Sequence, residues 1–227
     1  MLLHIPQVLT PDEVGECRRQ LERGRWVDGR GTAGHLSAEV KNNAQLHWRD
    51  PVAVTLGELI VARLEQNPMF LSAALPHRIL PPLFNRYAGG EHYGPHLDGA
   101  IRPIDGTRER VRTDLSATLM LTAPEDYDGG ELVIDDTFGP RAVKLPAGDM
   151  ILYPGTSIHH VEPVTRGARV ASFFWVQSMI RDDADRTVLF ELDAAVQRMP
   201  RASREERDNV VRVTNIYHNL LRRWADV

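Results

Sequence analysis

The sequence predicts an α+β protein in which an antiparallel jelly-roll core is flanked by helices at both ends. Capping signals followed by apolar residues at helical spacing occur before residue 78 and again after residue 178. Between these regions the chain consists of short β-type runs separated by Gly, Pro and Asp turns, a pattern typical of an antiparallel sandwich or barrel. The predicted organisation is therefore a helical region at 1–77, a jelly-roll domain at 78–178 and a helical extension at 179–227.

The N-terminal region contains three helix starts in which a capping residue stands directly before a proline. The pairs are Thr10-Pro11, Asp50-Pro51 and Asn67-Pro68. Glu13 completes a capping box with Thr10. The first helix is expected to run to about residue 23, the second to about residue 66, and the third is short. The polar stretch between residues 29 and 48 is expected to be extended.

The central region contains β-type runs bounded by turn residues. They span 79–87, 115–122, 131–134, 142–145, 150–153 and 170–176. This density of strands within about 100 residues suits a jelly roll. After residue 178 an apolar stripe predicts a first helix, and a second capping box at Ser203 and Glu206 opens another that contains Tyr217 and Trp224.

The bulk composition excludes several classes of protein. A formal net charge of -4 and a pI near 6.1 give no basic footprint, so neither nucleic acid nor an anionic membrane is expected as a partner. The single cysteine, Cys17, excludes an intramolecular disulfide and a cysteine-based zinc cluster, and it fits a reducing cytoplasm. No segment approaches the roughly 20 apolar residues that span a bilayer. We therefore expect a cytoplasmic protein.

His96-Leu97-Asp98 places two metal-capable side chains two residues apart. On a strand these side chains project from the same face and can chelate one ion. Alone, the triplet says little, because a chain of this composition contains roughly 0.7 such triplets by chance. A surface histidine beside a loop aspartate is the alternative interpretation.

A second signal lies between Tyr153 and Arg169, where His159 and His160 follow a Pro-Gly turn. Adjacent side chains on an extended strand face opposite ways, so only one of the two histidines is expected to reach a shared ion. Two imidazoles and one carboxylate form the ligand set of non-heme iron(II) oxygenases, which keep adjacent positions open for a keto acid and dioxygen. The two signals together predict such a centre.

Arg169 begins a strand whose two faces are both mostly apolar. A buried arginine needs an anionic partner, because an unpaired buried charge is very costly. The far carboxylate of 2-oxoglutarate matches the guanidinium with two parallel hydrogen bonds. The alternative partner is an acidic side chain such as Glu162.

Several sequence blocks carry a resemblance to a known family. They are residues 87–98, 115–121, 129–132, 148–149 and 159–169. In this order they resemble the blocks of the prolyl 4-hydroxylase-like iron(II)/2-oxoglutarate oxygenases. More narrowly, the chain is similar to the bacterial PKHD-type hydroxylases of the PiuC/YbiX group, since residues 163–175 and the helical tail also match. The similarity runs over nearly the whole chain.

This resemblance implies iron ligands at His96, Asp98 and His159 and a 2-oxoglutarate contact at Arg169, and the family's ten-residue spacing favours His159 over His160. It also implies a double-stranded β-helix fold, Fe(2+) as the metal cofactor and 2-oxoglutarate and O2 as cosubstrates. L-ascorbate is implied as a reductant. It does not identify the hydroxylated substrate, because function resides in the site and not in the fold. A small-molecule or peptide substrate is expected.

Neighbouring residues leave alternatives open. Tyr87 is expected either to donate its hydroxyl to the cosubstrate or to be a core tyrosine. His92 and Tyr93 either line a substrate entrance or lie in a loop. Residues 102–112 hold four arginines and form either a lid over the metal or a solvated loop.

Three functions are compatible with these features. The leading one is a dioxygenase that hydroxylates an unidentified substrate and converts 2-oxoglutarate to succinate and CO2. The alternatives are a non-catalytic iron/2-oxoglutarate sensor and a cupin-like metal isomerase or hydrolase, which leaves Arg169 without its main purpose. A homo-oligomer is also expected, because the C-terminal helix can pack either on its own barrel or on a neighbouring copy.

Overall fold

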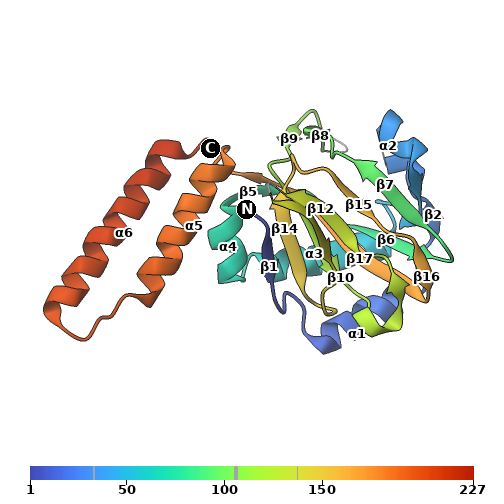
Figure 1. Cartoon of the computed structure of the whole chain (residues 1–227). Coiled ribbons are helices and arrows are strands. Elements are labelled where there is room, and N and C mark those ends of the chain that lie inside the picture. The colour runs from blue at the N-terminus through green and yellow to red at the C-terminus, as the bar shows by residue number, and fades with distance from the viewer. Residues whose placement is uncertain (33, 105–106, 137) are drawn as a thin grey trace.

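The computed structural model describes residues 1–32, 34–104, 107–136 and 138–227. It contains two facing antiparallel sheets with helices around them, so the predicted α+β jelly-roll class is confirmed (Figure 1). None of the helices within the described ranges is both long enough and apolar enough to cross a bilayer.

The large sheet collects strands from the first, middle and last parts of the chain. Its strands, in spatial order, are β1 (Leu3–Ile5), β14 (Met150–Pro154), β10 (Leu115–Met120), β17 (Ala168–Ser178), β6 (Leu83–Ala88), β4 (Ala44–Leu46) and β2 (Trp26–Asp28), and β5 (Pro76–Ile79) also pairs with β17. The long strand β17 lies at the centre and pairs with β10 on one side and β6 on the other.

The small sheet covers the inner face of the large one. Its strands, in spatial order, are β13 (Gly139–Val143), β12 (Leu132–Asp136), β15 (His159–Val161), β7 (His92–His96) and β3 (Lys41–Asn42). Two further antiparallel pairs are β8 (Ile101–Pro103) with β9 (Arg110–Arg112) and β11 (Asp128–Gly129) with β16 (Val164–Arg166).

Four of the helices begin where the capping residues predict them. The α-helices are α1 (Pro11–Leu21), α2 (His35–Glu39), α3 (Pro51–Leu64), α4 (Pro68–Ala74), α5 (Asp183–Arg198) and α6 (Arg204–Trp224), and short 3-10 turns occur at Gly29–Thr32 and Pro124–Asp126. Thr10 and Ser203 form the two predicted capping boxes, and Asp50 and Asn67 cap α3 and α4.

Side-chain alternation divides the apolar residues between two cores. Ala117 and Leu119 of β10 belong to the core between the large sheet and helices α1, α3 and α4. Met120, one residue later, faces the barrel interior together with residues of the small sheet such as Leu132. The barrel interior is therefore closed by apolar side chains at one end, while polar members of the same strands line its open part.

The N-terminal region supplies strands as well as the expected helices. β1, β2, β3 and β4 add strands to both sheets, and the stretch from residue 29 to 48 also contains the short helix α2. The run at 79–87 is divided into β5 and β6, because Pro81 and Pro82 cannot donate to a ladder. The division into three regions at residues 77 and 178 stays a prediction.

Helices α5 and α6 form a hairpin that projects from the barrel (Figure 1). Tyr217 and Trp224 of α6 pack over a small cluster that contains Leu75 and Leu189, so these aromatic side chains cover the molecule's own surface. Arg186 of α5 is buried at the base of this hairpin and donates to the carbonyl oxygen of Ile180.

Candidate metal and cosubstrate site

His96 and His159 meet on neighbouring strands of the small sheet. His96 ends β7 and lies directly opposite His159, the first residue of β15, in an antiparallel pair. Asp98 follows His96 by two residues. One ligand atom from each of these three side chains lies within 4.8 Å of the others. The sheet register thus brings together the three residues that the sequence predicted as metal ligands.

Backbone carbonyl groups fix the tautomer of both histidines. Nδ1–H of His96 donates to the Gly94 oxygen at 2.9 Å, and Nδ1–H of His159 donates to the Ser157 oxygen at 3.0 Å. A carbonyl oxygen only accepts, so the proton of each neutral ring lies on Nδ1. Nε2 of each ring is then left with a lone pair, which is the atom a metal ion needs.

The surroundings of His96 favour the neutral imidazole. Burial, and after it the proximity of His159, lowers the pKa of His96 to about 4. Tyr93 stacks on the His96 ring, with 3.5 Å between ring centroids and 14° between ring planes. The ring is therefore held in place and unprotonated near neutral pH.

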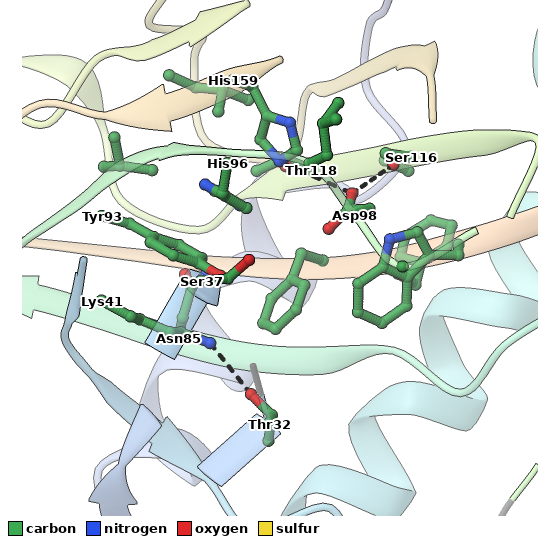
Figure 2. A pocket seen from close by; sticks show the side chains of 18 of the residues that line it. Thr32, Ser37, Lys41, Asn85, Tyr93, His96, Asp98, Ser116, Thr118 and His159 are labelled. Carbon is green, nitrogen blue, oxygen red and sulfur yellow. Dashed lines mark hydrogen bonds and ion pairs between the residues drawn. The ribbon is translucent and has the colours of Figure 1, made fainter. Parts of the chain in front are cut away.

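Asp98 is oriented by a residue from the large sheet. Ser116 of β10 donates its hydroxyl proton to Asp98 Oδ2 at 2.7 Å, and His159 Nε2 lies 3.7 Å from the same oxygen (Figure 2). The other carboxylate oxygen has no hydrogen bond to a described residue. The carboxylate is thus anchored through one oxygen.

His160 points away from these groups. Its Nε2 lies 3.1 Å from Glu162 Oε1, and it stands opposite Val133 of β12. The two adjacent histidines therefore face opposite sides of the strand, and His159 is the one placed beside His96 and Asp98.

Arg169 is fully buried and has no anionic partner among the described residues. It is 1% exposed, and its Nε and Nη1 atoms have no hydrogen-bond partner in that part of the chain. Nη2 lies 3.7 Å from the Met120 sulfur. Glu162, the acidic partner considered from the sequence, pairs with His160 instead. The alternative of a salt bridge to Glu162 is therefore wrong.

Tyr87 lies directly opposite Arg169 in the register of β6 and β17. The guanidinium carbon is 5.5 Å from the centroid of the Tyr87 ring, and burial holds the pKa of the Tyr87 hydroxyl well above its usual range. The hydroxyl therefore stays protonated and remains a hydrogen-bond donor.

One cavity joins all five predicted site residues. His96, Asp98, His159, Arg169 and Tyr87 are among the side chains that line it.

Sequence patterns missed two residues of this cavity, Ser116 and Lys41, and left a third, Tyr93, open. Tyr93 was left open between an entrance and a loop, but it lies on β7 and its ring forms part of the cavity wall. Ser116 gave no signal, because its nearness to Asp98 depends on how two distant strands pair. Lys41 lay in a polar stretch with no recognisable pattern, although it too lines the cavity.

The segment expected to be either a lid or a solvated loop forms a two-stranded hairpin where it is described. β8 and β9 pair from Ile101 to Pro103 with Arg112 to Arg110. Residues 105–106 lie outside the described residues. Arg102 stacks over Trp175, 3.9 Å from the ring centroid, and lines the cavity. Whether the hairpin moves stays a prediction.

Family models match two consecutive parts of the chain. Residues 82–177 match the 2OG-Fe(II) oxygenase superfamily, and residues 183–226 match the PKHD-type hydroxylase C-terminal domain. A PKHD-type hydroxylase of Bordetella pertussis is 57% identical over 227 residues, which is 100% of both chains. The PKHD-type hydroxylase PiuC of Pseudomonas aeruginosa is 55% identical, again over 100% of both chains.

Solved structures with the same fold are more distant in sequence. A 2OG-Fe(II) oxygenase family oxidoreductase from Burkholderia pseudomallei has a TM-score of 0.54 at 18% identity, covering 80% of this chain and 85% of its own. HygX from Streptomyces hygroscopicus, with nickel and 2-oxoglutarate bound, has a TM-score of 0.53 at 16% identity, covering 78% and 82%. These similarities show the fold.

The family relationship decides between the three functions considered from the sequence. It favours the dioxygenase over the sensor and the cupin-like enzyme, and it confirms iron(II) and 2-oxoglutarate as the cofactor and cosubstrate. The chain belongs to the PKHD-type hydroxylases and is an iron(II)- and 2-oxoglutarate-dependent dioxygenase that hydroxylates an as yet unidentified substrate.

Proposed function

We propose that His96, Asp98 and His159 hold the iron(II) of this dioxygenase and that Arg169 and Tyr87 hold the far carboxylate of 2-oxoglutarate. The observation that carries the proposal is the buried guanidinium of Arg169, which has two nitrogen atoms without partners among the described residues and lines the same cavity as the three ligand side chains. 2-Oxoglutarate carries two carboxylates, so one can pair with the Arg169 guanidinium while the keto acid end binds a metal held by the three ligand side chains.

The donor set fits the metal. Two neutral imidazole nitrogens and one carboxylate oxygen form the facial triad used by non-heme iron(II) oxygenases. His96 and His159 lie opposite each other in the small sheet and Asp98 follows β7 by two residues, so the three side chains would hold an ion from neighbouring positions and could leave its other positions to ligands in the cavity. The residues therefore match the ion in chemistry as well as in number.

The cosubstrate pocket fits a carboxylate. Arg169 presents a planar fork of donors that matches a carboxylate in two parallel hydrogen bonds. Tyr87 adds a hydroxyl donor from the neighbouring strand. The walls around them include Met120, Leu132 and Val161 and are apolar, which strengthens the attraction between the guanidinium and an anion.

When bound, iron(II) with 2-oxoglutarate and O2 supplies the oxidation that converts a substrate C–H to C–OH and releases succinate and CO2. The chain's own part is to bind and orient. Gly94 and Ser157 hold the imidazole rings, Ser116 holds the Asp98 carboxylate, and Arg169 places the cosubstrate against the metal side of the cavity.

The remaining features of the function are proposals of the same kind. L-ascorbate is proposed as the reductant that keeps the iron in its ferrous form, and a small molecule or peptide as the substrate. A cytoplasmic location is supported by the single, buried Cys17. A homo-oligomer is supported by exposed apolar residues on the helical hairpin, such as Val211 and Ile216, and sedimentation velocity tests it.

Paired histidine variants test the metal ligands. We expect His159→Ala to lose iron(II) affinity and 2-oxoglutarate-dependent succinate release, whereas His160→Ala keeps both. His160 is a matched control because it neighbours His159 on the same strand and bonds only to Glu162. Iron binding measured by titration and succinate release from labelled 2-oxoglutarate give the result. The reverse pattern transfers the ligand role to His160.

A further inference from the structure

Lys41 is a buried cation in the wall of the active-site cavity. It lies on β3, pairs with Tyr93 of β7, and is 6% exposed. Its ammonium group lies 5.0 Å from the centroid of the Tyr93 ring and 5.9 Å from that of Phe173 (Figure 2). Strand β3 of the small sheet thus places the Lys41 ammonium group at the cavity, separated from His96 by the Tyr93 ring.

The partners of Lys41 in the described part of the chain are neutral. Nζ donates to Thr32 Oγ1 at 3.0 Å and to Gln45 Oε1 at 2.9 Å. No carboxylate of the described residues lies within ion-pair distance of it. Burying an ammonium group is costly without a counter-charge, and two neutral oxygens compensate only part of that cost.

A second polar group of the same wall lacks a partner in the described part of the chain. Asn85 of β6 is 8% exposed and lines the cavity, and its Oδ1 has no hydrogen bond to a described residue. It stands opposite Gln45 in the β4–β6 register, and Gln45 is one of the two residues that accept from Lys41. A buried acceptor without a donor costs free energy, and a ligand that carries a donor would remove this cost.

The charge of the loaded cavity is also unbalanced. Asp98 is the only carboxylate among the described lining residues, and the same lining contains the two cations Arg169 and Lys41. Iron(II) and doubly charged 2-oxoglutarate neutralise each other, so loading the enzyme leaves this excess of positive charge in place. The excess attracts an anion that is neither the metal nor the cosubstrate.

We infer that Lys41 and Asn85 bind the primary substrate, and that this substrate carries a carboxylate with a neighbouring hydroxyl or N–H group. The inference rests on the proposed function of the cavity. The carboxylate pairs with the Lys41 ammonium, and the neighbouring donor pairs with Asn85 Oδ1. The Tyr93 ring stacks on His96 and also lies beside the Lys41 ammonium group, so only this one ring separates Lys41 from a candidate metal ligand. A small molecule whose carboxylate pairs with Lys41 would therefore place its neighbouring carbon atoms close to the metal position.

Two further features agree with an anionic, partly apolar ligand. Burial, and after it the charge of Arg102, lowers the pKa of Lys41 to about 8, so a bound carboxylate would stabilise its protonated form. The cavity also shares Leu97, Arg102 and Trp175 with an adjoining groove of about 1130 Å³. The apolar part of a carboxylate ligand could extend from the cavity into this groove.

The chain offers a direct probe, because its sequence contains Lys only at positions 41 and 144. Lysine labelled with carbon-13 at Cε gives two signals in NMR spectra of the zinc-substituted enzyme with 2-oxoglutarate bound. The probes are acetate, lactate and phenylacetate, each compared with its uncharged amide. We expect the carboxylates, lactate above acetate, to shift the Lys41 signal and to bind about tenfold more tightly than their amides, while the Lys144 signal stays still.

Variants then assign the effect. Lys41→Met is expected to abolish the preference for carboxylate over amide and to change zinc and 2-oxoglutarate affinity less than twofold, whereas Lys144→Met keeps the preference. Asn85→Leu is expected to remove the advantage of lactate over acetate.

Two results overturn the inference. One is a Lys41 signal that none of the carboxylates shifts. The other is a Lys41→Met variant that loses 2-oxoglutarate affinity as strongly as carboxylate affinity, which assigns Lys41 to the cosubstrate. Failure of the proposed function is seen separately, as unchanged iron binding in His159→Ala, so the two failures are distinguishable.

Discussion

The hydroxyl of Ser116 donates to Asp98 Oδ2 at 2.7 Å across the space between the two sheets. Ser116 comes from the centre of the large sheet, and Asp98 follows the last residue of β7 in the small sheet. The hydrogen bond therefore links the carboxylate of the candidate triad to the large sheet, and the same Oδ2 lies 3.7 Å from His159 Nε2.

Ser116→Ala is expected to weaken iron binding without removing it. The carboxylate loses the hydrogen bond that orients it, and the loss of such an orienting partner typically lowers metal affinity or activity by about 10–100-fold. Iron(II) titration of the apoenzyme, followed by succinate release at saturating iron, measures the effect. Excess iron should restore most of the activity.

Ser72→Ala is the matched control for this substitution. Ser72 also donates to an aspartate at 2.7 Å, but its partner is Asp193, at the contact between α4 and α5. Equal losses of iron affinity in the two variants would mean that Ser116 acts on overall stability and not on Asp98.

Arg169→Lys is expected to raise the dissociation constant of 2-oxoglutarate by about 10–100-fold while iron affinity changes little. The lysine keeps the charge but replaces the planar fork with a single point donor, so the paired hydrogen bonds to the carboxylate are lost. Titration of 2-oxoglutarate into the zinc-substituted enzyme measures the change. Arg181→Lys, at an exposed residue paired with Asp226, is the control. Parallel loss of metal and cosubstrate affinity would indicate a folding role for Arg169.

Tyr87→Phe separates the two interpretations of this tyrosine. If its hydroxyl donates to the cosubstrate, the variant loses one neutral hydrogen bond, and 2-oxoglutarate affinity falls by about 3–10-fold while the melting temperature changes little. If Tyr87 is only a core residue, the affinity for 2-oxoglutarate is unchanged. Tyr217→Phe on the helical hairpin controls for the removal of a partly buried hydroxyl elsewhere.

The sequence predicted the fold class and the helix starts because these depend on local rules. Thr10, Asp50, Asn67 and Ser203 cap their helices as expected, since capping involves residues three or fewer positions away. The prediction of one run at 79–87 is wrong, because Pro81 and Pro82 cannot donate to a ladder and separate β5 from β6.

In the candidate site, local sequence rules predict some residues and not others. Arg169 was predictable because one strand with two apolar faces cannot tolerate a charge without a partner. Ser116 and Lys41 were not, because their roles depend on which strands lie opposite each other. No pattern within β3 or β10 records that Lys41 pairs with Tyr93 or that Ser116 approaches Asp98.

Lys41→Met is expected to stabilise the protein at pH 7, because the wild-type enzyme buries a charge without a counter-charge. Burial, then Arg102, depress the pKa of Lys41 to about 8, while Asp98 and Asp28 act in the opposite direction. The difference from the ordinary lysine value of 10.5 corresponds to a cost on the order of 3 kcal/mol, which the loss of the bonds to Thr32 and Gln45 partly offsets.

The pH dependence gives this prediction its sign. Below about pH 8 the lysine is charged in both the folded and unfolded states, so the cost of burial is fully present. Between about pH 8 and the ordinary lysine pKa of 10.5 the unfolded state binds more protons, and the stability of the wild type rises relative to that of Lys41→Met. Urea unfolding of both proteins across this range measures the difference, with Lys144→Met as the control. If Lys41 is kept for a ligand, its buried charge costs stability in the ligand-free enzyme. A Lys41→Met variant that is less stable than wild type at pH 7, by an amount that does not change with pH, would instead show that Lys41 stabilises the fold through Thr32 and Gln45.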